Sequence, residues 1–217
     1  MEITNEGFAV IENDTHIGKW VKENKRLDFD TNAIPLILKH ININDAVVDA
    51  GANIGAYSYA FLKKANFVLS FESNPEAYEC LKYNLKNFDN SFCYNLALGS
   101  IAGKVEIVKD INAGASHCKM SPNGTVDMIT IDSFNLQKCD FIKIDCEGFE
   151  VDILRGAIKT IQKFHPKMYI EVNRGALERA GATASDLFNF LDLFNYKYEN
   201  IYSHEPMQGE QFDIIAV

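Results

Sequence analysis

The amino-acid sequence predicts an α/β fold built on a mostly parallel sheet. From Asp45 onward, short runs rich in β-branched and aromatic residues alternate with segments whose apolar residues keep helical spacing. Such alternation indicates parallel strands joined by covering helices. The chain has 217 residues and is 47% hydrophobic, which suits one core. No apolar run approaches the roughly 20 residues that a membrane span needs.

The first two strand and helix units carry the clearest pattern. Residues 46–51 (AVVDAG) are expected to form the first strand, and residues 53–65 the helix after it. Residues 66–73 (NFVLSFES) are expected to form the second strand. The next helix should begin at Asn74 as its cap, with Pro75 in the first turn. Its apolar residues keep helical spacing: Tyr78, Leu81, Leu85 and Phe88.

The later elements follow the same rhythm after one interruption. Residues 91–99 are expected to form the third strand, followed by a β excursion formed by residues 104–108 and 127–134. The polar segment 112–124 inside the excursion contains Gly, Ser, Pro and Asn, which indicates a surface loop. The remaining elements are a strand at 139–145, a helix with the buried stripe Leu154, Ile158, Ile161 and Phe164, a strand at 167–173, a helix at 185–196, and strands at 197–202 and 211–217.

The first forty-odd residues do not share this rhythm. They include the segment DTHIGKW and an expected helix around Ile34 to Ile41. We expect residues 1–44 to form a cap or lid packed beside the first strand, and residues 45–217 to form the main domain.

Charge and cysteine content exclude several classes of function. The net charge of -9 and the pI near 5.0 disfavour nucleic acid as a partner, because phosphate backbones attract basic faces. The five cysteines form no C-x-x-C pair, so we expect reduced, mostly buried thiols rather than a zinc site or a disulfide framework. The amino terminus shows no signal peptide, and the expected compartment is the cytoplasm. Oligomeric state is not predicted.

The turn after the first predicted strand, VVDAGANIGAYS, indicates a ligand site. In open α/β sheets, ligands bind beyond the carboxyl ends of the strands. Gly51 and Gly55 would let the backbone approach a ligand closely, and Asp49 and Asn53 offer polar side chains there. Glu72 ends the second strand about 20 residues later, the spacing at which a carboxylate can accept both ribose hydroxyls. These features predict a nucleoside cofactor.

Two alternatives remain at this turn. A dinucleotide fingerprint needs glycine where Asn53 stands, which disfavours an NAD-dependent oxidoreductase. The glycines could also serve only to let a helix pack closely on a strand. After the third strand, Asn95 and Ala97 fall where the edge and face of an adenine could lie.

Four segments together resemble the FkbM family of S-adenosylmethionine-dependent methyltransferases: VVDAGANIGAYS, FESNP, NLALGS and DFIKIDCEGFEVDILRGA. The similarity extends over roughly Ala46 to Asn173, and the last segment is the most specific. It implies a class I, Rossmann-like methyltransferase fold with a seven-stranded, mostly parallel sheet whose last strand is antiparallel. It also implies an acceptor that is usually a hydroxyl on a sugar or a natural product.

The resemblance implies a role for each residue around the cofactor. Gly51 and Gly55 would line its methionine part, Glu72 would hold the ribose, and three residues would flank adenine: Asn74, Asn95 and Ala97. The complete set expected to contact S-adenosylmethionine is Asp49, Gly51, Ala52, Asn53, Gly55, Glu72, Ser73, Asn74, Asn95, Ala97 and Asp145.

The segment DCEGFE places acidic residues just past the fourth strand, where an acceptor must meet the methyl group. Methyl transfer needs positioning, and an alcohol acceptor must lose its proton. We expect Asp145 and Glu147 to face the acceptor, one of them as base or orienting group. Glu147 and Glu150 could instead stabilise the first turn of the following helix, and for Glu150 we prefer that interpretation.

Histidines offer a second source of a base. His117 in the excursion is included in the expected catalytic set, and His16 and His204 could also reach the site. His165 and His40 are expected to be structural and surface residues.

The sequence also allows a magnesium ion. Asp145 ends one strand, and Glu171 and Asn173 end the next, which forms the oxygen-rich set that magnesium prefers. A metal-free site is the preferred interpretation.

The sequence thus predicts an O-methyltransferase that acts on a hydroxyl of a sugar, glycan or small natural product. The alternatives are an NAD-dependent oxidoreductase and a cofactor-binding module without turnover. DNA amino-methyltransferases carry an N-P-P-Y-type segment where this chain has DCEG, which disfavours base methylation.

Overall fold

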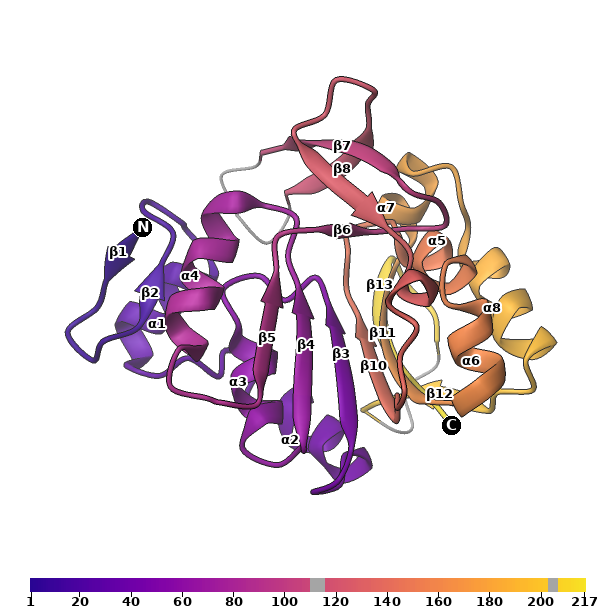
Figure 1. Ribbon diagram of the computed structural model, residues 1–217, viewed down its shortest axis with the longest axis horizontal. Helices are drawn as coiled ribbons and strands as arrows, with labels where there is room; N and C mark the ends of the chain where they lie inside the picture. Colours follow the sequence, from indigo (N-terminus) through magenta and orange to yellow (C-terminus); the bar gives the residue numbers. More distant parts are fainter. Residues whose placement is uncertain (110–115, 203–206) are drawn as a thin grey trace.

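The central sheet contains seven strands in the order β12-β13-β11-β10-β3-β4-β5 (Figure 1). A computed structural model describes residues 1–109, 116–202 and 207–217. The strands of the central sheet are β3 (Ala46–Ala50), β4 (Phe67–Phe71), β5 (Ser91–Tyr94), β10 (Phe141–Ile144), β11 (Lys167–Asn173), β12 (Tyr198–Asn200) and β13 (Gln211–Ala216). Six of these strands run in the same direction, and β13, which lies between β11 and β12, runs opposite to them. The predicted sheet, with its antiparallel last strand, is confirmed.

Alternating side chains along the strands build two cores, one on each face of the sheet. On one face, Val48 and Ile142 pack with α5, α6 and α8. On the other, Val47 and Phe141 pack with α2, α3 and α4. Residues two apart on a strand point to the same face, so neighbours in sequence serve different cores. The helices are α2 (Ala33–Ile37), α3 (Ala56–Leu62), α4 (Pro75–Leu85), α5 (Glu150–Arg155), α6 (Ile158–Phe164) and α8 (Ala184–Leu193).

A second sheet lies across the carboxyl ends of β3, β4 and β5, at the top of Figure 1. Its order is β6-β9-β7-β8, with β6 (Ala97–Leu98), β7 (Gly103–Val108), β8 (His117–Met120) and β9 (Val126–Ile129). The single strand predicted at 91–99 is therefore wrong, because the chain leaves the central sheet after Tyr94 and joins β9 instead. The predicted surface loop is wrong at β8, which pairs with β7.

The helix predicted after β10 is also interrupted. It divides into α5 and α6 because Gly156 packs against the chain at Gly99, where an added Cβ would lie 2.0 Å from the carbonyl oxygen. The Asp132 carboxylate in the short helix η3 (Ile131–Phe134) then accepts hydrogen bonds from Lys159 N and Thr160 N and caps α6. The helix α7 (Arg174–Arg179), which follows β11, was not predicted from the sequence.

The amino-terminal segment packs on α4 and beside β3. It contains β1 (Glu2–Ile3), β2 (Ala9–Val10), α1 (Ile17–Asn24), α2 and the short helix η1 (Leu38–His40), so the helix predicted around 34–41 is α2 followed by η1. Asn84 on α4 ties the segment down, since its carboxamide bonds to the Ala9 backbone and to Ile54 O. Ile37 and Ile41 pack in the same core as Val47 of β3.

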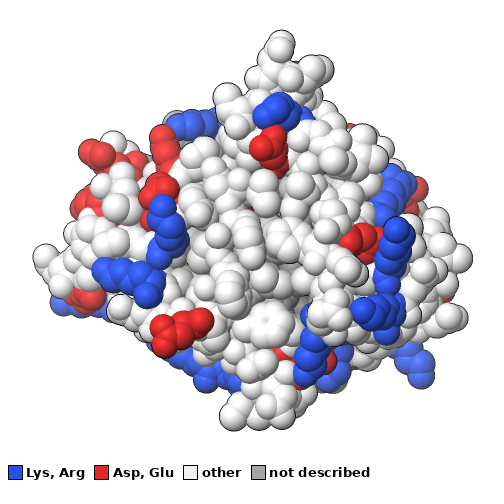
Figure 2. All heavy atoms as spheres, viewed as in Figure 1, with Lys and Arg blue, Asp and Glu red and all other residues white. Residues whose placement is uncertain are grey.

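The face in Figure 2 carries acidic and basic residues interspersed around a broad uncharged area, without a continuous basic stripe. Among the described residues, no helix has the length and apolar character needed to span a membrane. The five cysteines are unpaired, and Cys80 and Cys139 are buried while the other three are partly buried.

Candidate functional site

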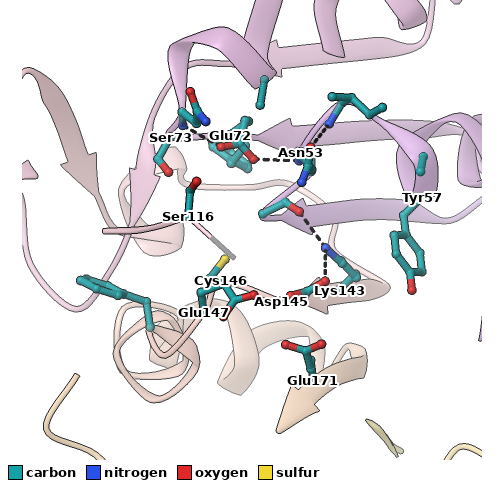
Figure 3. Close-up of a pocket in the computed structure, with 18 of the residues that line it drawn as sticks. Asn53, Tyr57, Glu72, Ser73, Ser116, Lys143, Asp145, Cys146, Glu147 and Glu171 are labelled. Atoms are coloured by element: carbon teal, nitrogen blue, oxygen red, sulfur yellow. Dashed lines mark hydrogen bonds and ion pairs between the residues drawn. The ribbon is translucent and has the colours of Figure 1, made fainter. Parts of the chain in front are cut away.

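A cavity of about 500 Å³ opens at the carboxyl ends of the central strands (Figure 3). Its wall has two parts, which we call the β3–β5 half and the β10–β13 half. The β3–β5 half comprises Gly51, Ala52, Asn53, Phe71, Glu72, Ser73, Asn74, Leu96, Ala97, Leu98, Ile107 and Cys118. The β10–β13 half comprises Asp30, Tyr57, Lys143, Asp145, Glu147, Tyr169, Glu171, Asn173, Gln211 and Asp213.

Gly51 is where the two halves meet. Its φ is 78°, and an added Cβ would lie 1.9 Å from the Asp145 carbonyl oxygen. Its N–H and that of Ala52 both donate to Phe71 O, which fixes the turn against β4. Only glycine allows this backbone conformation and this approach to β10.

Glu72 organises the β3–β5 half through backbone donors. Its Oε2 accepts from Asn53 N at 2.7 Å, and its Oε1 accepts from Asn74 N at 2.6 Å. Asn53 has a φ of 50°, a conformation that asparagine tolerates better than most residues. Burial raises the pKa of the Glu72 carboxyl, although these two backbone donors act against that rise. The carboxylate is thus held at the cavity wall, with lone pairs left for hydroxyl donors.

The rest of the β3–β5 half is an apolar wall. Ala97 and Leu98 on β6, Ile107 on β7 and Cys118 on β8 line it, and all three strands belong to the second sheet. The Cys118 thiol donates to Ser73 Oγ at 3.2 Å. An apolar wall beside a fixed carboxylate suits a ligand with a flat apolar ring and adjacent hydroxyls.

Two residues expected to contact the cofactor support the site without lining it. Gly55 has a φ of 95°, and an added Cβ would lie 2.9 Å from Leu81 Cδ1, so its role is the close packing of α3 on α4. The Asn95 carboxamide donates to Glu72 O at 2.8 Å and to Ser73 O at 3.1 Å. It therefore holds the loop after β4 rather than facing the cavity.

Asp49 does not line the cavity either, because it is fully buried beneath the turn. Its carboxylate accepts from Ser58 Oγ at 2.6 Å and pairs with Lys143 Nζ at 3.4 Å. Lys143 also lies 3.4 Å from Asp145 and donates to Gly51 O at 2.8 Å. Burial lowers the pKa of Lys143, but Asp145 and Asp49 more than offset this and raise it above its usual value.

Lys143 was missed by the sequence analysis. The available signal was a lysine within the otherwise apolar strand CDFIKID, which requires a buried partner. The partners are visible only once β3 and β10 pair and bring Asp49 beside Lys143.

The turn after β10 has a strained backbone conformation at Glu147, whose side chain lines the cavity. Glu147 has a φ of 52°, which is uncommon for a residue with a side chain, and it pairs with Arg179 at 3.9 Å. Buried Glu150 accepts from Cys146 N and Gly148 N and so stabilises the turn, which agrees with a structural role. Asp145 and Glu147 both line the cavity, as expected.

Glu171 joins these two acids across the sheet (Figure 3). Carboxylate oxygens of Asp145, Glu147 and Glu171 all lie within 4.8 Å of one another. The Asp145 carboxylate, followed by burial, raises the pKa of Glu171 to about 10. The Gln211 side chain donates to Glu171 Oε1 at 2.7 Å. The protonated form of Glu171 is therefore favoured over its ionised form.

A layer of tyrosines and acids completes the β10–β13 half. The rings of Tyr57 and Tyr169 lie 6.0 Å apart, and the Tyr57 hydroxyl donates to Asp30 at 2.8 Å. Asp30 belongs to the amino-terminal segment, so that segment reaches the site. Burial raises the pKa of Asp213 on β13 to about 6. None of these residues stood out in the sequence, because their spacing along the chain carries no motif.

The histidine and magnesium predictions are revised. On β8, Cys118 faces the cavity, so alternation along the strand turns His117 away from it. His16 does line the cavity, and His204 lies outside the described residues. Asn173 lines the cavity, and its side-chain oxygen accepts from Ala176 N and caps α7. Glu147, which was not in the predicted magnesium set, lies with Asp145 and Glu171 in a group of three carboxylates.

The site geometry agrees with the comparisons to known proteins. A hexuronic acid methyltransferase, AglP, from Haloferax volcanii is 27% identical over 154 residues. The aligned region is 67% of this chain and 63% of the relative, so this chain spans under two thirds of the relative's length.

Solved structures show the same fold. An FkbM methyltransferase from Methylobacillus flagellatus matches with a TM-score of 0.57 and 19% identity, covering 82% of this chain and 44% of that one. A Streptococcus mutans protein in complex with S-adenosylhomocysteine matches with a TM-score of 0.54 and 12% identity, covering 85% and 94%.

The model of the methyltransferase FkbM domain matches residues 49–198, which is more than half of the chain and includes both halves of the cavity apart from Asp30 and β13. This chain therefore belongs to the FkbM methyltransferase family.

Proposed function

We propose that this chain is an S-adenosylmethionine-dependent O-methyltransferase acting on a hydroxyl of a sugar, glycan or small natural product. One observation carries the proposal. A single cavity joins a carboxylate held by backbone donors, Glu72, to a group of acids at the ends of β10 and β11. The first feature suits a nucleoside and the second suits an acceptor hydroxyl.

The β3–β5 half fits the cofactor by the chemistry of its groups. Glu72 would accept the two ribose hydroxyls, and the wall at Ala97 and Leu98 would take the adenine ring. Gly51 would allow the methionine part to lie close to the backbone. When bound, S-adenosylmethionine would supply a methyl group attached to a positively charged sulfur. The acceptor oxygen would bond to the methyl carbon, and the sulfur would leave as a neutral thioether.

The β10–β13 half would position the acceptor and take its proton. Asp145 lies next to Gly51 in space, at the boundary between the two halves. Its carboxylate would accept the proton of the acceptor hydroxyl, and Glu147 would orient that hydroxyl by hydrogen bonding. Lys143 holds Asp145 in place through their ion pair.

We also propose that residues 1–44 serve as a cap over the acceptor. Four residues of this segment line the cavity: His16, Ile17, Phe29 and Asp30. A sugar acceptor is favoured over nucleic acid because the chain is acidic, and the name of the Haloferax relative refers to a hexuronic acid. The cytoplasm remains the proposed compartment.

A magnesium ion is a separate element of the proposal. Asp145, Glu147 and Glu171 could supply its oxygens, and the ion would then help hold the acceptor oxygen. A metal-free reaction predicts full turnover after exhaustive treatment with a chelator. Loss of turnover that magnesium restores would instead assign these carboxylates to a metal.

The test of the proposed function combines binding with turnover. Calorimetry should show binding of S-adenosylhomocysteine and no binding of NAD. Incubation with S-adenosylmethionine and a panel of sugars should add one methylene mass to an acceptor. Tighter binding of NAD would favour an oxidoreductase, and cofactor binding without turnover on any acceptor would favour a binding module.

A further inference from the structure

The β10–β13 half has an unbalanced set of charges. Five carboxyl groups line it, from the amino-terminal segment, the turn after β10, β11 and β13: Asp30, Asp145, Glu147, Glu171 and Asp213. Because Glu171 favours its protonated form, the negative charge comes from the other four. The five groups come from four separate parts of the chain, so the charge of this half is set by the fold and not by one acidic run.

Lys143 is the one lysine or arginine among the described residues that line the cavity, and its charge is already paired with carboxylates of this chain. It is 1% exposed and lies 3.4 Å from both Asp49 and Asp145. Its third contact is Gly51 O at 2.8 Å. An anionic ligand would have to separate Lys143 from these partners, which would leave a buried carboxylate unpaired.

Among the described residues, no second lysine or arginine lines the cavity, where His16 is the remaining basic side chain. Arg179 does not line the cavity, and it is held at the rim by Glu147, whose backbone oxygen accepts from it at 3.2 Å. In the sequence, residues 110–115 and 203–206 contain no lysine and no arginine.

Aromatic side chains also line the cavity beside these carboxylates. The Tyr57 and Tyr169 rings lie 6.0 Å apart, and Phe29 lines the cavity next to Asp30. Ring faces pack against the C–H faces of a sugar, while carboxylates accept hydrogen bonds from its hydroxyls. A carboxylate on the ligand would meet like charges, which opposes binding.

We propose that the acceptor is an uncharged sugar. Asp30 and Asp213 would make the site reject the corresponding uronic acid, which has the same sugar ring but carries a carboxylate. This inference rests on the proposed O-methyltransferase function and names its substrate class. It separates this chain from the Haloferax relative, whose name refers to a hexuronic acid.

The test uses matched pairs of ligands: methyl glycosides of several hexuronic acids and the corresponding primary amides. The two members of a pair differ in charge and hardly in shape. In the presence of a chelator, kcat/KM for the amide should exceed that for the acid by at least about tenfold, the effect of about 1.4 kcal/mol of repulsion. Equal rates, or a preference for the acid, would overturn the inference.

Variants locate the source of the selectivity. Asp213→Asn and Asp30→Asn should each raise kcat/KM for the acid relative to the amide by several-fold, because each removes one negative charge at nearly constant shape. Asparagine at position 30 can still cap α2, whose Ala33 N binds Asp30 Oδ1. The control is Asp127→Asn, an exposed acid on β9 that pairs with Lys104 and should leave the ratio unchanged. An unchanged ratio in both site variants would contradict the assignment.

Binding separates this inference from the proposed function. Saturation-transfer NMR on protein loaded with S-adenosylhomocysteine should detect the amides and not the acids. If amides bind selectively without being methylated, the charge selectivity stands and the proposed activity fails. If acids are methylated, the activity stands and the selectivity fails. Binding of neither member of any pair, or a preference for acids that appears on adding magnesium, would overturn the uncharged-sugar assignment.

Discussion

The two halves of the cavity are built in different ways. In the β3–β5 half, backbone N–H groups of the turn after β3 and of the loop after β4 hold the carboxylate of Glu72, and strands of the second sheet add an apolar wall. In the β10–β13 half, side chains from Asp30 to Asp213 converge, and carboxyl groups face each other. The contacts of Glu72 join residues that are close together in the chain. The second half forms only because the sheet brings distant segments together.

The difference extends to stability. The Glu72 carboxylate has two donors, so its burial is compensated. Among Asp145, Glu147 and Glu171, repulsion is relieved by the ion pair between Lys143 and Asp145, and it raises the pKa of Glu171 and so favours its protonated form. Sites that oppose local stability in this way are commonly functional. The comparison predicts that changes in the two halves have different consequences.

The largest expected effect comes from the ion pair beneath both halves. Lys143→Met should lower the free energy of unfolding by about 3 to 5 kcal/mol, because Asp49 stays buried without a cation. For a chain of this size, that is a fall in Tm of roughly 6 to 20 °C. The control is Lys82→Met, which breaks an exposed pair with Glu79 and should leave the Tm nearly unchanged. Equal effects in the two variants would contradict the role of Lys143.

The second prediction separates chemistry from cofactor binding. Asp145→Asn should reduce turnover roughly 10²-fold or more, and Glu147→Gln should also reduce it, while both leave binding of S-adenosylhomocysteine unchanged. Each substitution is nearly isosteric. Loss of cofactor affinity in either variant would mean that the residue binds the cofactor. Normal turnover of both with the true acceptor would leave His16 or His204 as the base.

The third prediction concerns Glu72. Glu72→Ala should weaken binding of S-adenosylhomocysteine by about 1 to 3 kcal/mol, since the ribose loses its acceptor and two backbone N–H groups lose their partner. Calorimetry measures the change. Glu76→Ala is the matched control, because Glu76 is exposed and pairs with Lys109 on the surface. If both variants bind equally well, Glu72 is not a cofactor ligand.

The smallest effect is a pH dependence in the β10–β13 half. The folded-state pKa of Glu171 is raised to about 10, so its contribution to stability is present at acid pH and is lost as the pH rises toward that value. Glu171→Gln removes this loss. Its Tm should exceed that of the wild type at pH 8, and the difference should shrink as the pH is lowered toward 5. A destabilised variant at pH 8 would mean that Glu171 is ionised and paired there.

Much of the fold could be predicted because it follows short-range patterns. The order of strands and helices from Ala46 onward and the Asn74 cap follow from local composition and spacing. The errors lie where tertiary contacts override those patterns. The strand predicted at 91–99 is split by a second sheet, and the helix after β10 is broken where Gly156 packs against Gly99.

By itself, the sequence determined the β3–β5 half of the site, including Gly51, Asn53 and Glu72, because positive-φ turns and strand ends depend on residues near each other in the chain. It also carried the acids of DCEG. Only the tertiary structure decided that Asp49 supports Lys143 rather than a ligand, that His117 faces away, and that Glu171 and Asp213 join Asp145. The physical reason is that electrostatic partners are set by the order of strands in the sheet, and that order is not a local property of the chain.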